Sequence, residues 1–474
     1  MSGPLRVFLA ALAIAALALA GAVYLGYRSR LISAPHSGDV FNLASRGNIA
    51  AYLHDPRMDE SLVAITLQRV EQSYYQPVNV GSLLKGEHTA LVSLLAQHHL
   101  TDISLPSPSA GLDRSAQLSL AERELGAAEH RYGVQLGTKG DDELTTVALS
   151  GMLAPLHDPY TVYLSPRQIR SLNESLSGGN FGGIGVYIEP AKNGDVFVAP
   201  IAGMPAARAG MKTGQVVDAV NGQSIGHLSL DRVEQLIRGP VGSIVRIQTH
   251  DFDHPKVTHT YSIVRRTIHV PTVYSKMING FDYIHLADFG ETSTAEVRKA
   301  LLNGIAHHAK GYILDLRDDG GGLLETAIGV SSLFIKHGVI VSTIKRDGSH
   351  NDQEARGTAI GGIRPLAVLV NQYTASASEI TAGAIQDYKA GILVGTKTFG
   401  KGVVQSIYAL PNDGALKITT ARYLTPLGRD IEHRGIEPNI IVRQSADPAL
   451  FGTPADKQLA TAEAELQRRR HPTR

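Results

Sequence analysis

The first part of the chain places apolar residues mainly at helical spacing. The stretch "MDESLVAITLQRVEQSYY" (58–75) repeats them three and four positions apart, with Asp59 and Glu60 near its start. Helices are therefore expected over about 42–98. The segment 101–119 is rich in Ser and Pro and is expected to form a loop. After it, "LAERELGAAEHRYG" predicts a short helix and "DDELTTVALSGMLAPL" predicts a further one.

The pattern changes at Ser177, where short strand-like runs alternate with glycine and Asn-Gly turns. "VYIE", "DVFVAPI" and "QVVDAV" are typical of strands, and "SIVRIQTHD" and "THTYSIVRR" predict a strand pair. "MPAARAG" and "SLDRVEQLIRG" predict two helices. Residues 178–267 are therefore expected to fold as a compact β-barrel domain with two helices.

From about 268 to 445 strands alternate with helices. "FDYIHLADF", "GYILDLRDD" and the apolar "LAVLVN" predict strands, while "STAEVRKALLNGIAHHA" and "SASEITAGAIQDY" predict helices. Such alternation predicts a sheet covered by helices, with chemistry at the strand-to-helix turns. The segment 446–474 is expected to be a charged, solvated tail that contains a helix, with a role in dimerisation as the alternative.

Composition excludes several functions. The 474 residues suffice for roughly two to four domains, and the net charge of +1 gives no reason to expect nucleic-acid binding. Cysteine is absent, so thiol nucleophiles, thiolate metal sites and disulfides are excluded. The 19 histidines include no H-E-x-x-H pattern and no phosphate-loop motif occurs, so neither a metal, a cofactor nor ATP is predicted.

The N-terminus carries an uncharged apolar segment from Val7 to Tyr27. At about 1.5 Å rise per residue this length can cross a bilayer as a helix. It also contains Ala18-Leu19-Ala20, a pattern that a signal peptidase could cleave. Residues 1–30 are therefore either a cleaved signal or a retained anchor, and the length favours the anchor.

The clearest chemical candidates lie in "NQYTASASEITAGAIQDYKAGILVGTKTFGKGVVQ" (371–405). Ser376 needs a base to become a nucleophile, and this stretch contains no histidine. Lys401 can serve if burial disfavours its charged form, and the neutral Gln405 can orient it without restoring charge. The alternative is that Thr374, Ser376 and Ser378 simply cap a helix.

Several motifs together resemble the carboxyl-terminal processing (tail-specific) serine proteases, peptidase family S41. They are "FGGIGVYIEP…GMPAARAGMKTGQVVDAVNGQSI", similar to the family's PDZ domain, then "YILDLRDDGGGLL" and "TASASEITAGAIQDY…VGTKTFGKGVVQ". "HDPYTVYLSP" also resembles the family segment that precedes the PDZ domain. The resemblance covers about 145–440 and implies catalysis by Ser376, Lys401 and Gln405. Two features depart from the family: Asp318-Asp319-Gly320 replaces its usual Asn and Pro, and about 99–140 resembles an insertion.

Two further groups of residues follow from the resemblance. Backbone N–H groups of Gly321 and Ala377 are the candidates for the oxyanion hole, since glycine lets the backbone approach a substrate closely. The PDZ loop is expected to bind a peptide C-terminus through the backbone of consecutive residues, namely Gly183, Ile184, Gly185 and Val186.

The sequence thus predicts an α/β multidomain chain. A signal or anchor (1–30) precedes an N-terminal helical region (31–177), a PDZ-like β-barrel domain (178–267) and a β/α catalytic core (268–445), which the resemblance assigns to the ClpP/crotonase type. The predicted function is an ATP-independent serine endopeptidase that binds protein C-termini and cleaves near them. The alternatives are a catalytically inactive PDZ scaffold and a crotonase-like acyl-CoA enzyme.

The expected location is the bacterial cell membrane or the exported fraction, with the catalytic body on the extracytoplasmic side. The expected partners are protein or peptide substrates and, through the N-terminal segment, the membrane. The sequence leaves homo-oligomer formation open.

Overall fold

The chain contains two compact units. The computed structural model describes residues 61–470 except 101–104, 106–111, 134–139, 177–180, 191–194, 227, 229, 270 and 362–363. One unit combines the chain up to Leu172 with the chain from Val273 onward, and the other spans Asn173–Thr272. The apolar segment at 7–27 lies outside the described residues. Within the described ranges, no helix is both long enough and apolar enough to span a bilayer.

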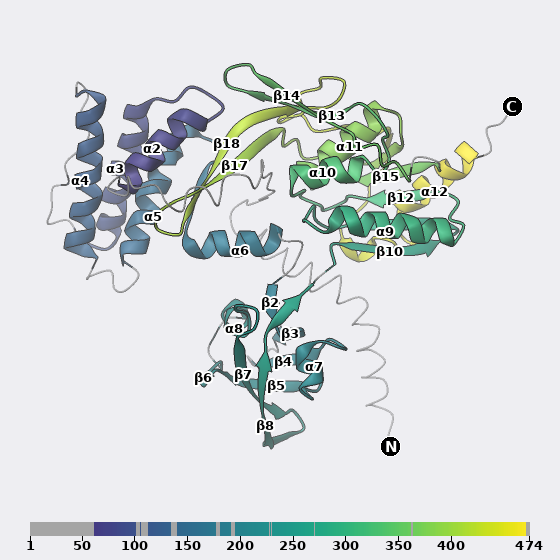
Figure 1. Cartoon of the computed structure of the whole chain (residues 1–474), viewed down its shortest axis with the longest axis horizontal. Helices are drawn as coiled ribbons and strands as arrows, with labels where there is room; N and C mark the ends of the chain where they lie inside the picture. The colour runs from purple at the N-terminus through teal and green to yellow at the C-terminus, as the bar shows by residue number, and fades with distance from the viewer. Residues whose placement is uncertain are drawn as a thin grey trace. The chain divides into compact units, whose positions relative to one another are not determined.

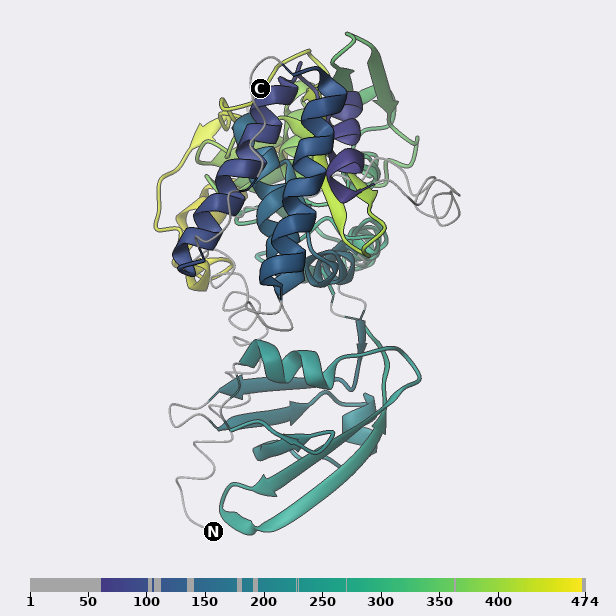
Figure 2. The same ribbon diagram turned by 90° about the vertical axis from the view of Figure 1, so that its left-hand side faces the viewer.

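Four helices form a layer at the start of the first unit (Figures 1 and 2). They are α2 (Leu62–Ser73), α3 (Val80–Gln97), α4 (Arg114–Tyr132) and α5 (Gly140–Leu153), followed by the short η3 (Ala154–Leu156). The side chains of Ser61, Asn79 and Asp113 accept backbone N–H groups in the first turns of α2, α3 and α4. Such caps satisfy donors that a helix leaves unpaired at its start. Apolar residues from all four helices then form one buried core.

The expectation of a loop over 101–119 was wrong at its C-terminal end. Helix α4 begins at Arg114, because the Asp113 carboxylate accepts the Ala116 N–H at 2.8 Å and the sequence contains no proline over 109–154. The α4 part of the segment that resembled an insertion therefore belongs to the helical core: Ala121, Leu125 and Ala128 are buried there.

The half of the first unit from Val273 onward, which the sequence predicts to be catalytic, is called the catalytic half and is built on a six-stranded sheet in the order β10-β11-β12-β15-β16-β19. Only the edge strand β10 runs antiparallel. The strands are β10 (Val273–Ile278), β11 (Phe281–Leu286), β12 (Tyr312–Asp315), β15 (Leu366–Val370), β16 (Ile392–Gly395) and β19 (Ile440–Ile441). The predicted alternation of strands and helices is confirmed, since the connections contain α9 (Ser293–Ala306), α10 (Leu324–Ser331) and α11 (Ala377–Asp387).

Alternate residues of these strands face two different cores. Ile284, Leu314 and Val368 pack with α9, α10 and α11, whereas Ile313 and Leu369 pack with the C-terminal helix α12 (Lys457–Arg470). The segment η4 (Pro448–Leu450) precedes that helix. The predicted helix is thus present, but its apolar face is not solvated: Leu459, Ala462 and Leu466 are buried against the sheet.

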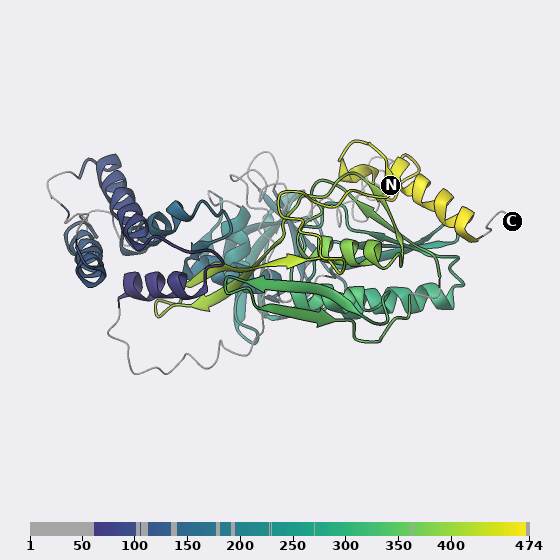
Figure 3. The ribbon, with the colours of Figure 1, turned by 90° about the horizontal axis from the view of Figure 1, so that it is seen from above.

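A second, antiparallel sheet joins the helical layer to the catalytic half (Figure 3). Its strands are β1 (Val162–Leu164), β13 (Val339–Lys345), β14 (His350–Glu354), β17 (Val403–Ala409) and β18 (Ala415–Leu424). One end of the β17–β18 hairpin contributes Leu410, Leu416 and Ile418 to the core of the helical layer. Near its other end, Val404 and Ala421 belong to the core around α11.

The inserted unit has its own core and is coloured teal in Figure 1. A sheet in the order β3-β4-β5-β7-β8, with β6 beside β5, packs against α7 (Pro205–Arg208) and α8 (Leu230–Ile237). The residue at which the chain passes from one unit to the other lies within α6 (Pro166–Leu176). The strands are β2 (Phe181–Gly183), β3 (Val186–Pro190), β4 (Val196–Pro200), β5 (Gln215–Val220), β6 (Gln223–Ser224), β7 (Ile244–Asp251), β8 (His254–Val264) and β9 (Arg266–Ile268). The predicted strand pair and both helices are confirmed.

Candidate active site

Ser376 lies at the turn between β15 and α11, where it precedes the first residue of the helix. Its backbone has φ 54° and ψ −116°, a conformation that a residue with a side chain rarely adopts. Strain of this kind is typical of nucleophiles held at a sharp strand-to-helix turn. The side chain is fully buried, and among the described residues its Oγ has no hydrogen-bond partner.

The two neighbouring hydroxyl groups are engaged in the fold. Thr374 Oγ1 donates to the Leu316 carbonyl oxygen at 2.8 Å, and Ser378 Oγ donates to the Asp319 carbonyl oxygen at 3.0 Å. Both bonds tie the start of α11 to the segment after β12. Of the three hydroxyls, Ser376 is therefore the one that no described hydrogen bond occupies.

Glu379 is a residue of this site that the sequence reasoning missed. One carboxylate oxygen, Oε2, accepts the backbone N–H groups of Ser376 and Lys401, both at 2.9 Å. The other, Oε1, accepts the Gly400 N–H at 2.8 Å and the Thr398 hydroxyl at 2.5 Å. Burial raises the pKa of Glu379 to about 7, although these four hydrogen bonds favour its ionised form. The carboxylate holds the backbones of both predicted catalytic residues at a single oxygen atom.

Lys401 and Gln405 come from the segment that leads into β17 of the second sheet and from that strand. Lys401 is fully buried and precedes β17, and Gln405 within that strand is 1% exposed. The Tyr423 hydroxyl lies 3.1 Å from the Ser376 carbonyl oxygen and 2.5 Å from the Lys401 carbonyl oxygen. The amide of Gln405 donates weakly to Thr419 Oγ1 at 3.5 Å, while its Oε1 has no hydrogen-bond partner among the described residues. The fold thus brings the backbones of Ser376 and Lys401 together at Glu379, while the described contact of the Gln405 side chain is with Thr419.

The glycine turn after β12 carries the residues that depart from the family. Asp318 has φ 58°, and its backbone N–H and its carboxylate both bond the side chain of Asn371. The buried Asp319 accepts the Gly321 N–H at 2.7 Å through Oδ1. The predicted oxyanion donor Gly321 therefore has an internal acceptor in this structure. The other candidate, Ala377, is the first residue of α11, where a helix provides no acceptor for the N–H.

A buried ion-pair network lies directly before the same glycine turn in the chain. Arg317 is fully buried between Asp315 and Asp456, with Arg317 Nη2 at 2.5 Å and 2.7 Å from their carboxylates. Its guanidinium also lies 3.8 Å from the centre of the Phe451 ring. Burial alone would raise the pKa of Asp315, but the adjacent guanidinium outweighs it and holds that pKa below its usual value. The segment before α12 is therefore attached directly to the strand that leads into the glycine turn.

Asp387 is the last residue of α11, and its carboxylate is engaged in the fold. Its side chain is 3% exposed, pairs with Arg429 and accepts the Leu427 N–H at 2.9 Å. These contacts fasten the end of α11 to the segment after β18, so Asp387 has a structural role.

In the inserted unit, the predicted peptide-binding loop joins β2 to β3. Gly185 has φ 70°, and its carbonyl oxygen accepts the Ile201 N–H, while the Ile184 carbonyl oxygen accepts the Ala206 N–H. The side chain of Ile184 is buried in the unit's core. The following strand β3 is the edge strand of its sheet, and Tyr187 on it is half exposed.

Comparison with known proteins places this arrangement in a family. Residues 281–442 match the model of peptidase family S41, and residues 196–249 match that of a PDZ domain. A carboxyl-terminal-processing protease of Synechocystis is 37% identical over 327 residues, which cover 68% of this chain and 76% of that protein. Its counterpart from Picosynechococcus is 38% identical over 324 residues, covering 66% and 77%. The chain belongs to the S41 carboxyl-terminal processing proteases.

The predicted family, the α/β multidomain fold and the serine-type peptidase class are thus confirmed, and the inserted unit contains the family's PDZ domain. Among solved structures, the photosystem II D1 C-terminal processing protease is 27% identical. That alignment covers 83% of this chain and 97% of that one, with a TM-score of 0.44.

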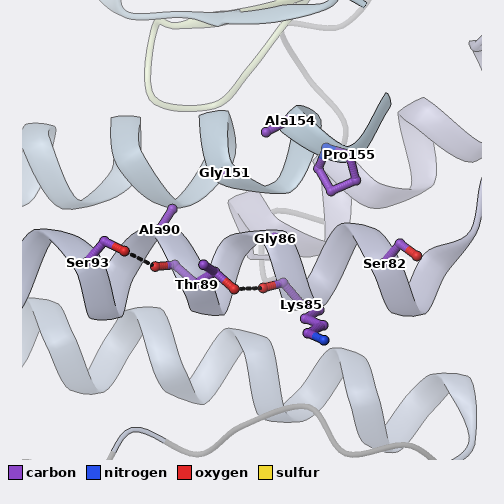
Figure 4. Close-up of a pocket in the computed structure, with 9 residues that line it drawn as sticks. All are labelled: Ser82, Lys85, Gly86, Thr89, Ala90, Ser93, Gly151, Ala154 and Pro155. Atoms are coloured by element: carbon purple, nitrogen blue, oxygen red, sulfur yellow. Dashed lines mark hydrogen bonds between the residues drawn. The ribbon is translucent and has the colours of Figure 1, made fainter. Parts of the chain in front are cut away.

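This S41 protease also has a surface groove of about 460 Å³ between α3 and α5 (Figure 4). Gly86 and Gly151 face each other there; a Cβ on Gly86 would lie 2.4 Å from the Gly151 carbonyl oxygen, so glycine permits the close helix crossing. Lys85 is the only charged residue among the described residues of its lining. Those lining residues include no pair of groups suited to acid–base chemistry.

Proposed function

We propose that this S41 protease is a serine endopeptidase in which Lys401 is the general base for Ser376 and Gln405 orients the lysine amine. The observation that carries the proposal is the shared contact at Glu379 Oε2, which fixes the backbones of Ser376 and Lys401 together. No described residue engages the Ser376 hydroxyl in a structural hydrogen bond, so the hydroxyl is available to a base and a substrate.

The chemistry follows from these positions. Lys401 Nζ accepts the proton as Ser376 Oγ attacks the scissile carbonyl carbon, and the resulting oxyanion is stabilised by backbone N–H groups of Ala377 and Gly321. Gly321 can donate to the oxyanion only if its bond to Asp319 is exchanged. The protonated Lys401 then gives its proton to the leaving amine. The neutral Lys401 next takes a proton from a water molecule, which attacks and hydrolyses the acyl-enzyme. None of these steps uses ATP or a metal.

We further propose that the PDZ domain captures the substrate's C-terminus. Strand β3 is a sheet edge, so its unpaired backbone groups can accept a peptide as an additional strand. The loop at 183–186 precedes that strand and would bind the terminal carboxylate through backbone N–H groups. Cleavage would then occur near the captured end of the substrate.

We place the catalytic body on the extracytoplasmic side of a bacterial membrane. The proposal rests on the apolar segment Val7–Tyr27, which is long enough to act as an anchor.

The test uses the purified full chain and a reporter protein with an unstructured, apolar C-terminal tail, without ATP. Intact mass of the products is expected to show tail cleavage by the wild type and by the control Ser378→Ala, but not by Ser376→Ala or Lys401→Ala. Cleavage by Ser376→Ala at the wild-type rate would refute the assignment of the nucleophile. Binding of the tail without cleavage by the wild type would instead favour the scaffold alternative.

A second arm tests the PDZ assignment. Amidation of the reporter's C-terminus removes the terminal charge, and we expect KM to rise at least tenfold while kcat changes little. Equal KM values for the two reporters would exclude recognition of the terminal carboxylate.

A further inference from the structure

The segment "HDPYT" (157–161) has no role in the chemistry described above. Its turn is fixed by Asp158, whose carboxylate accepts the Tyr160 N–H at 2.9 Å and the Thr161 hydroxyl at 2.7 Å. Thr161 Oγ1 in turn accepts the backbone N–H of Thr419 on β18 at 3.0 Å. Thr419 is also the residue to which Gln405 donates. The turn is therefore attached to the strand that contacts a predicted catalytic side chain.

This anchoring places the ring of Tyr160 against the predicted base. Lys401 Nζ lies 4.3 Å from the centre of the ring, within the range of a cation–π contact. The negative face of an aromatic ring attracts an ammonium group but has little preference for a neutral amine. The contact therefore favours the protonated form of Lys401.

The other titratable groups around Lys401 come from three elements. Glu379 on α11 accepts its backbone N–H, and the Tyr423 hydroxyl on β18 contacts its carbonyl oxygen. Glu432, in the segment after β18, accepts the Gly402 N–H and interacts electrostatically with Lys401. Burial raises the pKa of Glu432, and the Gly402 N–H and the charges of His433 and Lys401 oppose that rise. Tyr160 adds to these groups an aromatic face that lies 4.3 Å from the reacting nitrogen.

We propose that Tyr160 is a positioning residue for proton transfer: its ring holds Lys401 Nζ in place and stabilises the ammonium that forms when the lysine takes the Ser376 proton. The inference rests on the proposed function of Lys401. In the step itself, the O–H bond of Ser376 breaks, the Oγ–C bond to the substrate forms, and the proton resides on Nζ over the ring. Withdrawing negative charge from the ring face should therefore destabilise the Lys401 ammonium, both in the free enzyme and in the transition state.

The test varies the charge on the ring face while keeping its shape. Phenylalanine and 3,4,5-trifluorophenylalanine are placed at position 160 of the full chain; Tyr160→Phe removes only the hydroxyl, and fluorination withdraws charge from the face. The lysine pKa is measured by NMR of ¹³Cε-labelled lysine, with Lys401→Met identifying the signal. We expect Tyr160→Phe to retain the wild-type pKa and the trifluoro variant to lower it by roughly 0.5–1.5 pH units.

The kinetic arm is expected to follow the titration. In the trifluoro variant, the acid limb of the kcat/KM profile should move to lower pH by the same amount, and kcat on the plateau should fall roughly threefold to tenfold. A lysine pKa that is identical in the Phe and trifluoro variants would overturn the inference. If Lys401→Met cleaves the reporter normally while the Lys401 pKa still falls in the trifluoro variant, then Lys401 is not the base. In that case the contact between the ring and Lys401 stands, but its proposed role in proton transfer does not.

Discussion

Glu379 is the residue on which the backbone around Ser376 and Lys401, the proposed catalytic residues, depends. Its carboxylate is fully buried and accepts three backbone N–H groups and one hydroxyl, from both sides of the proposed nucleophile–base pair. Each buried donor left without an acceptor costs about 1–3 kcal/mol. The strained backbone of Ser376 is therefore stabilised by neighbours and not by its own conformational preference.

Replacement of Glu379 by alanine should reduce kcat strongly. Misplacement of a catalytic group by about 1 Å can cost ~100-fold, and we expect a loss of at least that size with a smaller change in KM. Steady-state kinetics on the tail reporter measures both. Glu325→Ala is the control, because this carboxylate is 70% exposed on α10 and should leave kcat unchanged. A Glu379→Ala enzyme with wild-type kcat would show that the carboxylate does not position the pair.

For single residues, the sequence predicted which side chains belong to the candidate site better than it predicted the hydrogen bonds between them. The resemblance of one motif to the family allowed Ser376, Lys401 and Gln405 to be selected, and Glu379 joins the backbones of the first two. Glu379 was missed because a glutamate three residues after a serine is typical of an ordinary helix cap. Its other donors, Thr398, Gly400 and Lys401, come from a segment about twenty residues later. Only the fold shows that this segment lies against Glu379.

Among the elements, α12 does more than cover the sheet. Asp456 at its start shares the buried Arg317 with Asp315, directly before the glycine turn. Removing one partner of a buried ion pair leaves an uncompensated charge, which typically costs about 3–5 kcal/mol. The C-terminal helix is therefore expected to be required for a stable catalytic half.

We accordingly expect Asp456→Ala to lower the free energy of unfolding by roughly 3–5 kcal/mol. Arg468→Ala on the exposed face of α12 removes a pair with Glu465 and should cost below about 1 kcal/mol. Urea denaturation of the full-length variants gives both values. Equal stability losses in the two variants would contradict a special role for the buried pair.

The sequence predicted most elements because their periodicity is regular. It failed where capping and packing decide the outcome: Asp113 starts α4 inside a segment that composition assigned to a loop. The charged face of α12 dominated its pattern, although Leu459, Ala462 and Leu466 recur on one side and are buried. The first error concerns a local cap, Asp113 to the Ala116 N–H, and the second concerns packing of α12 against a distant part of the chain.

For the whole molecule, the helical layer introduces a dependence of stability on pH. Glu87 on α3 is fully buried, and among the described residues neither of its oxygens has a hydrogen-bond partner. Burial raises its pKa to about 9, with smaller contributions from Glu124 and Glu122. Glu124 is buried as well and pairs with His88 at 2.6 Å.

A folded-state pKa above the unfolded value means that the folded state holds the proton more strongly. The contribution of Glu87 to stability is therefore fully present below pH about 4.5 and declines as the pH rises towards 9. We expect Glu87→Gln to stabilise the protein relative to the wild type at pH 8.5 by about 1–3 kcal/mol, and much less at pH 5. Thermal unfolding at both pH values measures the difference. The exposed Glu143→Gln on α5 is the control, and a gain for Glu87→Gln that is the same at both pH values would refute the argument.

Detection of the acyl-enzyme tests the proposed Ser376–Lys401 pair directly. Once tail cleavage has defined the scissile bond, a peptide ester of that bond is mixed with the full chain, quenched in acid and digested for mass spectrometry. We expect an acyl group on Ser376 in the wild type and its absence in Lys401→Ala. Product formation with the acyl group on another residue, or equal acylation in Lys401→Ala, would contradict the proposed Ser376–Lys401 pair.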